Sequence, residues 1–240
     1  MKHIPNLVTL VNLFGGTVAI VLSLRELPHH AALVIIGCMV LDFLDGALAR
    51  LLVARSKIGV QLDSLADLIS FGVAPATIVF HYLSMAVFVI PEGFFRTALP
   101  FAAFILPVFS ALRLARFNVE ENQEDEFRGL PTPASAFFFA SWPIVLFFSS
   151  EKGLIHSLVA TLVSNYAYLL LVLLFFCLIM VSKIPMFSLK VKGFGLKENK
   201  PRLAFIALIL VSIAVFGLPA IFLVIVFYLI LSLATYLFGN

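Results

Sequence analysis

Long apolar runs dominate this 240-residue chain and leave few folds open to it. Hydrophobic residues make up 62% of the sequence and charged residues 12%, whereas soluble domains average about 45–50% and about 25%. Only a backbone that satisfies its own hydrogen bonds can cross lipid, and unbroken apolar runs of roughly 20 residues favour helices over a β-barrel. The sequence therefore predicts an all-α, polytopic integral membrane helix bundle.

We place about eight transmembrane helices in this bundle, joined mostly by short loops. The seventh is short and could form a tight hairpin with the eighth around residues 216–219. The first run lacks a strongly basic segment before it and carries polar Asn6, Thr9 and Asn12, which predicts a retained span rather than a cleaved signal peptide. The expected spans are residues 5–24, 31–52, 60–84, 95–117, 132–149, 163–182, 202–216 and 219–238.

The basic residues are divided unevenly between the two sides of this layout. The positive-inside rule assigns the side richer in Lys and Arg to the cytoplasm. With a cytoplasmic N-terminus, the far side keeps only Arg25, Arg96 and Lys152. We therefore expect both termini in the cytoplasm, and the plasma (inner) membrane of a prokaryote as the location. The cytoplasmic side would hold Lys2, Arg50, Arg55, Lys57, Arg113, Arg116, Arg128, Lys183, Lys190, Lys192, Lys197, Lys200 and Arg202.

Four of the five aspartates lie in two neighbouring spans. Asp42 and Asp45 are three residues apart in the second, and Asp63 and Asp67 are four apart in the third, so each pair occupies one helix face. Antiparallel helices joined by a short loop bring both pairs to one depth. A carboxylate in hydrocarbon costs roughly 2.5–3.5 kcal/mol on insertion scales, so four together need a shared cation or a water-filled cavity. Their oxygen ligands favour Mg²⁺ or Mn²⁺, as one or two ions.

Gly46, Ala49 and Arg50 follow these aspartates along the second span. Small residues let a ligand or a helix approach the backbone closely, and a guanidinium at a helix end can grip a phosphate bidentately. Taken singly, each residue has an ordinary explanation in helix packing or snorkelling. Beside four intramembrane aspartates, the functional interpretation gains weight.

The pattern Asp42-x2-Asp45-Gly46-x2-Ala49-Arg50-x8-Gly59-x3-Asp63-x3-Asp67 resembles the signature of the CDP-alcohol phosphotransferases at every fixed position. The resemblance implies a six-helix membrane core, usually homodimeric, with its site in a cavity that faces the cytoplasm. Residues 1–240 would then be one membrane-embedded domain of that family, with the signature at 42–67 and a possible extra helix pair at 202–238.

The same resemblance implies roles for individual residues. Asp42, Asp45, Asp63 and Asp67 would form the metal site, and Asp67 would also be the catalytic base. The cytidine nucleotide pocket would be lined by Gly46, Ala49, Arg50 and Gly59, together with Asn6 and Thr9 from a Pro-Asn-x-x-Thr start similar to that of the family.

The strings RLARFN and GLPTP resemble the phosphatidylserine synthase branch of the family. Arg113 and Arg116 share a helix face at the cytoplasmic boundary, where they are either a positive-inside pair or an anion pocket beside the metal. The resemblance implies L-serine as the acceptor, with its carboxylate on Arg113 or Arg116 and its hydroxyl toward Asp67. Asn118 and Thr132 are further candidates for acceptor binding.

The expected function is therefore a metal-dependent transfer of a phosphatidyl group from CDP-diacylglycerol to L-serine, which gives phosphatidylserine and CMP. The expected partners are these two substrates, membrane lipids and a second copy of the chain, with no nucleic acid. One alternative is a sister transferase that uses glycerol 3-phosphate, inositol phosphate or choline. A second is an ion-coupled transporter, because intramembrane acids often mark ion paths, although all four aspartates cluster near one face.

Overall fold

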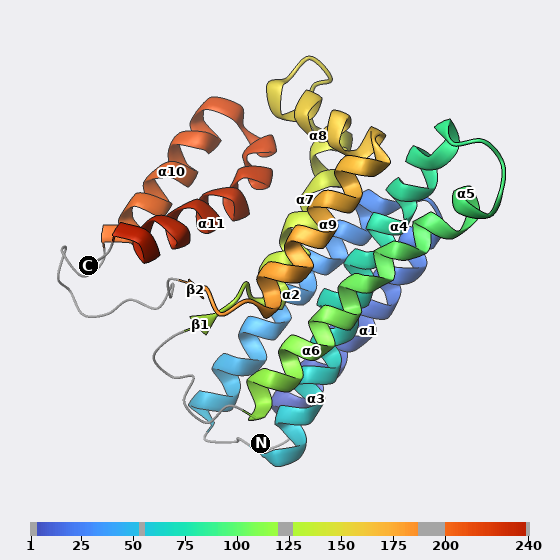
Figure 1. Ribbon diagram of the computed structural model, residues 1–240. Coiled ribbons are helices and arrows are strands. Elements are labelled where there is room, and N and C mark those ends of the chain that lie inside the picture. The colour runs from blue at the N-terminus through green and yellow to red at the C-terminus, as the bar shows by residue number, and fades with distance from the viewer. Residues whose placement is uncertain (1–3, 53–55, 120–126, 187–199, 239–240) are drawn as a thin grey trace.

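The structure, a computed structural model, describes residues 4–52, 56–119, 127–186 and 200–238, and nearly all of them are helical (Figure 1). The all-α expectation is confirmed. In chain order the elements are α1 (Ile4–Leu24), α2 (Pro28–Leu51), α3 (Lys57–Asp67), the π-helix η1 (Leu68–Val73), α4 (Ala74–Ala86), η2 (Val87–Val89), α5 (Phe94–Ala98), η3 (Leu99–Phe104), α6 (Ile105–Val119), β1 (Phe127–Arg128), α7 (Thr132–Phe148), α8 (Leu154–Ser164), α9 (Tyr166–Val181), β2 (Pro185–Met186), α10 (Lys200–Phe216), η4 (Leu218–Ala220) and α11 (Ile221–Phe238).

Every expected span coincides with a helical segment, but fewer than eight have full spanning length. In the part of the chain that is described, five helices are long and apolar enough to cross a membrane, or six if the bent pair α8–α9 is one span. The helices α7 and α10 have 17 residues each. At about 1.5 Å per residue they reach roughly 25 Å, short of a hydrocarbon core of about 30 Å. The chain is an integral membrane protein, and its described ranges contain five or six such helices.

The expected sixth span, residues 163–182, corresponds to α9, which begins at residue 166, directly after a sharp bend in the chain. The helices α8 and α9 meet at residue 165 with an angle of 96° between them. The Asn165 side chain accepts hydrogen bonds from the backbone N–H groups of Ala167 and Tyr168, at 2.9 and 3.4 Å, and so caps the start of α9. A cap residue in the middle of an apolar run therefore breaks what composition alone presents as one helix.

The helix α7 lies at the centre of the bundle, in contact with α2, α4, α8 and α11. Its Trp142 is fully buried, and Phe138 stacks on Phe176 of α9 with ring centroids 4.3 Å apart. Phe139 meets Trp142 edge to face at 5.0 Å. These ring contacts bury large apolar areas and hold α7 and α9 together, each aromatic pair adding about 0.5–1.5 kcal/mol beyond its area.

The third span changes to a π-helix directly after Asp67, and close packing holds it there. A Cβ on Gly16 of α1 would lie 2.8 Å from the Cα of Ser70, so only glycine allows α1 this close. The Ser70 hydroxyl donates to the Asn12 carbonyl at 3.0 Å. On the other side, a Cβ on Gly72 would meet the Cβ of Ser110 in α6 at 3.2 Å. The helices α1 and α6 pack tightly against opposite sides of this π-helix. This packing restricts the position of Asp67, which directly precedes it.

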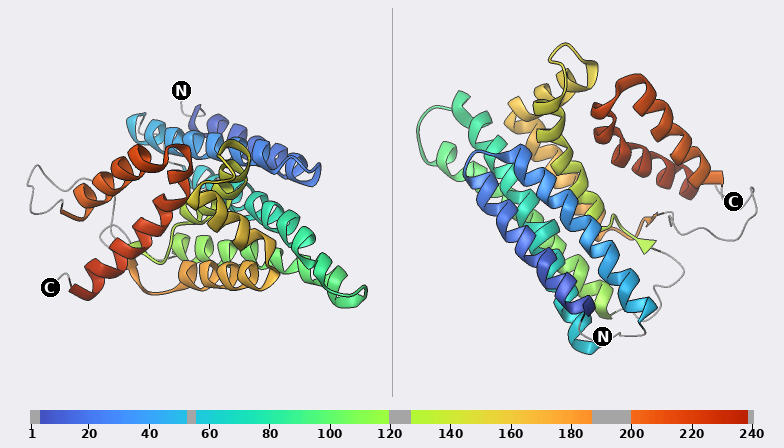
Figure 2. Two further views of the ribbon diagram at one scale, coloured as in Figure 1. Left: turned by 90° about the horizontal axis from the view of Figure 1, so that it is seen from above. Right: turned by 180° about the vertical axis from the view of Figure 1, so that it is seen from behind.

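The C-terminal helices α10 and α11 form the expected hairpin, which turns at Gly217 (φ +64°) and η4. Figures 1 and 2 show this pair beside the main bundle, where α11 contacts α7 and β2. The strands β1 and β2 pair antiparallel, with Phe127 opposite Met186 and Arg128 opposite Pro185. They tie the connection after α6 to the connection after α9.

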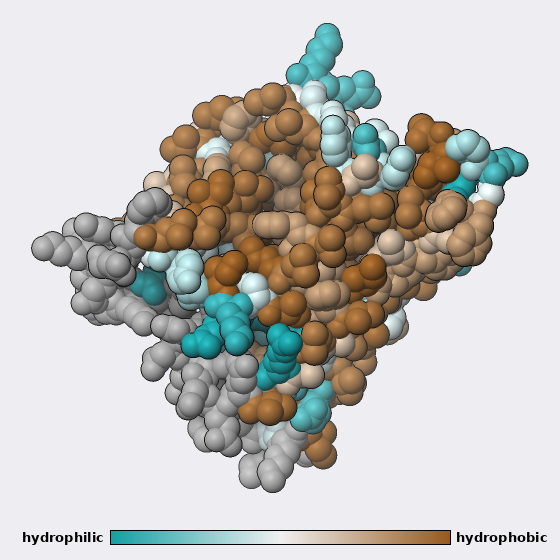
Figure 3. Space-filling model, viewed as in Figure 1, coloured by the Kyte–Doolittle hydropathy of each residue, from teal (hydrophilic) through white to brown (hydrophobic). Residues whose placement is uncertain are grey.

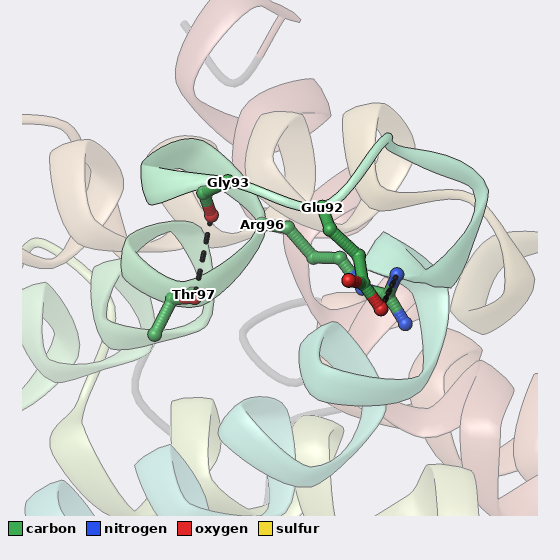
Figure 4. A network of polar contacts seen from close by, with 4 residues as sticks. All are labelled: Glu92, Gly93, Arg96 and Thr97. Atoms are coloured by element: carbon green, nitrogen blue, oxygen red, sulfur yellow. Dashed lines mark hydrogen bonds and ion pairs between the residues drawn. The ribbon is translucent and has the colours of Figure 1, made fainter.

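Polar surface gathers at the ends of the helices and apolar surface covers their flanks (Figure 3). Arg25 directly follows α1, Lys152 lies between α7 and α8, and Arg96 lies in α5; in Figure 1 these segments are at the end of the bundle far from α3. Arg96 forms an ion pair with Glu92 at 3.7 Å (Figure 4). It also lies over the Phe88 ring. Five of the basic residues expected on the cytoplasmic side lie outside the described residues: Lys2, Arg55, Lys190, Lys192 and Lys197. The two ends of the bundle therefore differ in charge in the way a topological signal requires.

Candidate metal centre and substrate cavities

Three of the four aspartates converge between α2 and α3. One carboxylate oxygen each from Asp42, Asp63 and Asp67 lies within 4.8 Å of the others. The loop between these helices ends at Ser56, whose hydroxyl accepts from the Gly59 N–H at 3.0 Å and starts α3, so the spacing of the pairs along two antiparallel helices produces the group. The expectation that both helices contribute carboxylates to one place is met by these three.

The group has the donor set and the electrostatics of a divalent cation site. Two carboxylates this close repel by about 3 kcal/mol at an effective dielectric constant of about 20, so three need compensation. Asp67 Oδ1 is fully buried and has no hydrogen-bond partner among the described residues. A buried acceptor without a partner calls for a cation, a proton or water. Hard oxygen ligands from two helices fit Mg²⁺ or Mn²⁺.

Asp45 lies outside this group, and α1 explains why. The Thr9 hydroxyl lies 2.7 Å from Asp45 Oδ2 and 3.0 Å from the Pro5 carbonyl oxygen, and it donates to these acceptors. Asp45 is 5% exposed and Thr9 is 4% exposed, so this contact is shielded from solvent. Thr9, predicted to contact the nucleotide, therefore supports a predicted metal ligand.

A cavity of about 230 Å³ opens beside Asp45 and Asp63, between α1, α2 and α3; we call it the α1–α3 cavity. A Cβ on Gly59 would come within 3.0 Å of Asn6 Oδ1 and Ser56 Oγ, so glycine keeps this wall open. Pro5, Ser56 and Val60 also line it and were not predicted. All six residues expected to bind the nucleotide line the cavity: Asn6, Thr9, Gly46, Ala49, Arg50 and Gly59.

A second cavity, of about 240 Å³, lies at the ends of α6 and α9 beside β1; we call it the α6–α9 cavity. Arg113 and Arg116, the expected acceptor residues, line it together with Arg128 and Lys183. Arg128 and Lys183 were expected only as topological charges, because nothing in the sequence indicated that β1 and β2 pair. Four cations around one cavity indicate an anionic or zwitterionic ligand.

Arg113 lines this cavity and contacts the start of α7. Its Nη1 donates to the Thr132 hydroxyl at 3.3 Å. Its Nε is buried and lacks a hydrogen-bond partner within the described ranges. Arg116 Nη1 instead donates to the Val181 carbonyl at 3.2 Å, at the end of α9. Of the two arginines, Arg113 is therefore bound by a side chain of α7 and Arg116 by the backbone at the end of α9.

The two remaining acceptor candidates act at a distance from the α6–α9 cavity. Asn118 Nδ2 donates to the Ser64 hydroxyl at 2.8 Å, on the turn of α3 between Asp63 and Asp67. Thr132 is fully buried and accepts from Arg113. Neither residue lines the cavity: Thr132 contacts Arg113, and Asn118 contacts the helix turn that carries Asp63 and Asp67, contacts that sequence spacing did not reveal.

A glycine in the GLPTP string packs against the end of α9, next to residues that line the α6–α9 cavity. Gly129 has φ +72°, and a Cβ there would run into the carbonyl oxygens of Met180 and Ser182. Its N–H donates to the Ile184 carbonyl at 2.9 Å, and the Leu130 N–H donates to that of Ile179 at 3.2 Å. The string therefore ties the start of α7 to the end of α9.

Comparison with known proteins agrees with this geometry. The family described as CDP-alcohol phosphatidyltransferase matches residues 2–177. Proteins named CDP-diacylglycerol–serine O-phosphatidyltransferase from Helicobacter pylori (strain 26695) and Bacillus subtilis are each 38% identical, over 134 and 133 residues, or 55% of this chain. The protein of that name from Saccharomyces cerevisiae is 40% identical over 152 residues, also 55% of this chain. The chain spans about half the length of the Helicobacter (53%) and yeast (50%) relatives and 71% of the Bacillus one.

Proposed function

We propose that this chain, which belongs to the CDP-alcohol phosphatidyltransferase family, transfers a phosphatidyl group from CDP-diacylglycerol to the hydroxyl of L-serine and releases CMP. The observation that carries the proposal is the convergence of Asp42, Asp63 and Asp67 within 4.8 Å, beside a cavity that Asp63 lines. The names of the relatives support serine as the acceptor. We take residues 1–240 as one domain, in which 202–238 is an addition beyond the matched 2–177.

The family is divalent-metal dependent, and the aspartates fit one or two Mg²⁺ or Mn²⁺ ions. Asp42, Asp63 and Asp67 would hold the metal, with Asp45 as a further ligand when it leaves Thr9 or through its second oxygen. A bound divalent cation neutralises the pyrophosphate and stabilises the leaving CMP. Without it, a doubly charged pyrophosphate would meet four carboxylates and be repelled.

The α1–α3 cavity is the proposed nucleotide side. Gly46, Ala49 and Gly59 leave room for the cytidine and its phosphates to approach the backbone. Arg50 lies at the mouth of this cavity, where its guanidinium can bind a phosphate in a bidentate manner. Asn6 supplies an amide for the base or the ribose.

The α6–α9 cavity is the proposed acceptor side, with Arg113 as the carboxylate ligand of serine. Asp67 accepts the proton of the serine hydroxyl while the serine oxygen bonds to the phosphorus that carries diacylglycerol. The bond from that phosphorus to the oxygen of CMP breaks, and CMP leaves with the bonding pair. The Thr132 hydroxyl accepts from Arg113 and so holds its guanidinium at the wall of this cavity.

The decisive experiment supplies purified protein in mixed micelles with CDP-diacylglycerol and radiolabelled serine, glycerol 3-phosphate, inositol phosphate or choline in parallel. We expect serine incorporation, equal molar CMP release, full loss with EDTA and recovery with Mg²⁺ or Mn²⁺. Incorporation of another acceptor instead would assign the chain to a sister activity. Turnover that survives complete chelation would overturn metal dependence, and ion flux without CDP-lipid would favour a carrier.

We also propose that the aspartate end faces the cytoplasm and that two copies associate. The uneven distribution of basic residues supports the orientation. An impermeant maleimide should label Glu92→Cys in intact spheroplasts of a bacterial host, and Val119→Cys only after permeabilisation; the reverse pattern would invert the topology. Light scattering in detergent should give twice the chain mass of 26.4 kDa, and a single-chain mass would refute the dimer.

A further inference from the structure

Asn12 of α1 is a buried polar side chain that the metal group and the two cavities leave unexplained. It is fully buried, and neither its Oδ1 nor its Nδ2 has a hydrogen-bond partner among the described residues. A buried donor or acceptor without a partner costs about 1–3 kcal/mol, so native structures rarely keep both ends of an amide in this state. The Asn12 amide therefore calls for a bound partner other than the side chains around it.

The packing of α1 against α2 places Asn12 at the level of Asp42. On one side of Asn12 along α1, the Thr9 hydroxyl bonds Asp45 at 2.7 Å. The Cys38 thiol of α2 donates to the Asn12 carbonyl at 3.4 Å. Because the two helices are antiparallel, the step of three residues from Thr9 to Asn12 matches the step of three residues back from Asp45 to Asp42. Both steps cover about 4.5 Å, so Asn12 and Asp42 lie at one depth on facing sides of the two helices.

The packing of α1 against η1 places the same side chain beside the turn that carries Asp67. The Ser70 hydroxyl donates to the Asn12 carbonyl at 3.0 Å, and a Cβ on Gly16 would lie 2.8 Å from the Ser70 Cα. Asn12 precedes Gly16 by one turn of α1, and Asp67 precedes Ser70 by one turn of a segment that runs in the same direction. Side chains on a helix lean toward its N-terminus, so the Asn12 amide points away from Ser70 and toward the level of Asp67.

A second unpartnered group lies at this level. Asp67 Oδ1 is buried and has no hydrogen-bond partner within the described ranges. Two such groups, on helices that pack against each other, indicate one ligand between them. Amide and carboxylate oxygens are both ligands that a divalent cation accepts. A neutral ligand also suits this position, because the three carboxylates of Asp42, Asp63 and Asp67 already exceed the two positive charges of one ion.

We propose that Asn12 belongs to the metal centre, where α1 adds its amide oxygen to the shell of oxygen atoms around the divalent ion. This inference rests on the proposed function, because it takes Asp42, Asp63 and Asp67 as the metal ligands. It does not depend on which acceptor the protein uses. The helix α1 would then contribute twice, through Thr9, which supports Asp45, and through Asn12, which faces the ion itself.

The first test replaces Asn12 by Leu, which has a similar shape and no polar side-chain atoms. Mn²⁺ affinity is measured by calorimetry on the full chain in detergent, and Tm is measured in EDTA. We expect the Mn²⁺ affinity to fall about tenfold or more, the usual cost of losing a group around a metal site. The Tm in EDTA should stay the same or rise, because a buried amide without a partner has been removed. An unchanged Mn²⁺ affinity would overturn the proposal.

Ser23→Ala is the matched control on the same helix. Ser23 is also buried, and its hydroxyl has no hydrogen-bond partner among the described residues. It lies about three turns beyond Asn12, toward the end of α1 far from the aspartates. This variant should bind Mn²⁺ as wild type does. A loss equal to that of Asn12→Leu would show that any buried polar group of α1 affects the site, and would overturn a specific contribution of Asn12.

Asn12→Asp tests the same position if the Leu variant does not fold. A carboxylate there is buried among other carboxylates, so the Tm in EDTA should fall. Mn²⁺ binds only the folded state of the site, so it should raise the Tm of this variant by more than it raises that of wild type. A Mn²⁺-induced rise no larger than that of wild type would place residue 12 away from the ion and overturn the proposal.

The same measurements separate this inference from the proposed function. If wild-type protein binds Mn²⁺ but transfers no phosphatidyl group to serine, the proposed function fails and the binding data still decide the place of Asn12. If wild-type protein binds no divalent cation, both fail. If it binds Mn²⁺ and transfers to serine while Asn12→Leu keeps full affinity, only the inference about Asn12 fails.

Discussion

The substitution Thr9→Val tests whether the hydrogen bond from α1 to Asp45 contributes to metal binding and activity. Val has nearly the same shape as Thr, so the change removes the hydroxyl without opening a cavity. The lost contact is the 2.7 Å hydrogen bond to Asp45 Oδ2, in a place where Asp45 is 5% exposed. A hydrogen bond to a charged group contributes about 1.5–3 kcal/mol, and removing it leaves the carboxylate free to turn.

That energy sets the expected size of the effect. About 1.4 kcal/mol corresponds to a tenfold change in rate. If the whole energy of this hydrogen bond serves to position Asp45 in the transition state, its loss should lower kcat/KM by roughly 10- to 150-fold. Part of the loss should appear as a higher concentration of Mn²⁺ for half-maximal activity, because Asp45 and Asp63 line the same cavity. Thr9→Ser keeps a hydroxyl and should retain most activity.

The assay is CMP release from CDP-diacylglycerol and serine over a Mn²⁺ titration, with the Tm of each variant measured in the same detergent. The control is Thr17→Val on the same helix, because the Thr17 hydroxyl is exposed and donates only to the Phe14 carbonyl, at 2.7 Å. Thr17→Val should leave rate and metal dependence unchanged. If Thr9→Val behaves as Thr17→Val does, the hydrogen bond has no part in positioning Asp45 and the argument is refuted.

Three further predictions address the base, the support of α3 and the clamp on α9. Asp67→Asn should abolish transfer while measurable Mn²⁺ binding by calorimetry persists, and a near-wild-type rate would remove Asp67 as the base. Asn118→Ala should lower kcat up to about tenfold and leave the serine KM unchanged, because it removes one neutral hydrogen bond to Ser64. A rise confined to the serine KM would instead indicate that Asn118 binds the acceptor. Gly129→Ala should lower stability by about 1–3 kcal/mol or more because of its positive φ and the carbonyls it would strike, whereas Gly37→Ala, with open space around it, should leave Tm unchanged or raised. Equal Tm values for these two would refute the clamp.

The nucleotide half of the site could be predicted from sequence because its geometry is local. Asp42, Asp63 and the small residues between them lie on two consecutive helices, and helical periodicity alone states which face each occupies. One short loop then makes the helices antiparallel neighbours. Helical periodicity could not predict the hydrogen bond from Thr9 of α1 to Asp45, a residue that lies outside the group of Asp42, Asp63 and Asp67.

The predicted spans agree with the structure where the length of an apolar run sets the bounds of a helix. They agree poorly where one polar side chain ends or starts a helix. Each span expected from hydropathy falls on a helical segment, since the hydrophobic requirement of the bilayer acts on composition, but α8 lies almost wholly outside these spans. It joined the end of α8 to α9 because it averages over a window, and one capping residue, Asn165, has almost no weight in such an average. The π-turn after Asp67 was invisible for a similar reason, because it depends on the approach of Gly16 and Gly72 to their neighbours rather than on its own residues.

The acceptor half could be predicted only in part because distant segments build it. Arg113 and Arg116 share a helix face, so their spacing indicated a pair, but Lys183 joins them only because β2 pairs with β1. The helix α11 also contacts β2, so segments far apart in the chain meet beside this cavity. If substrate choice in such a protein depends on these long-range contacts, the chemistry of the aspartates can stay fixed while the acceptor changes with the elements around Arg113. Exchanging the serine preference should therefore require changes in α6, β1 and β2 together, and a single substitution in α2 or α3 should alter the rate without altering the choice of acceptor.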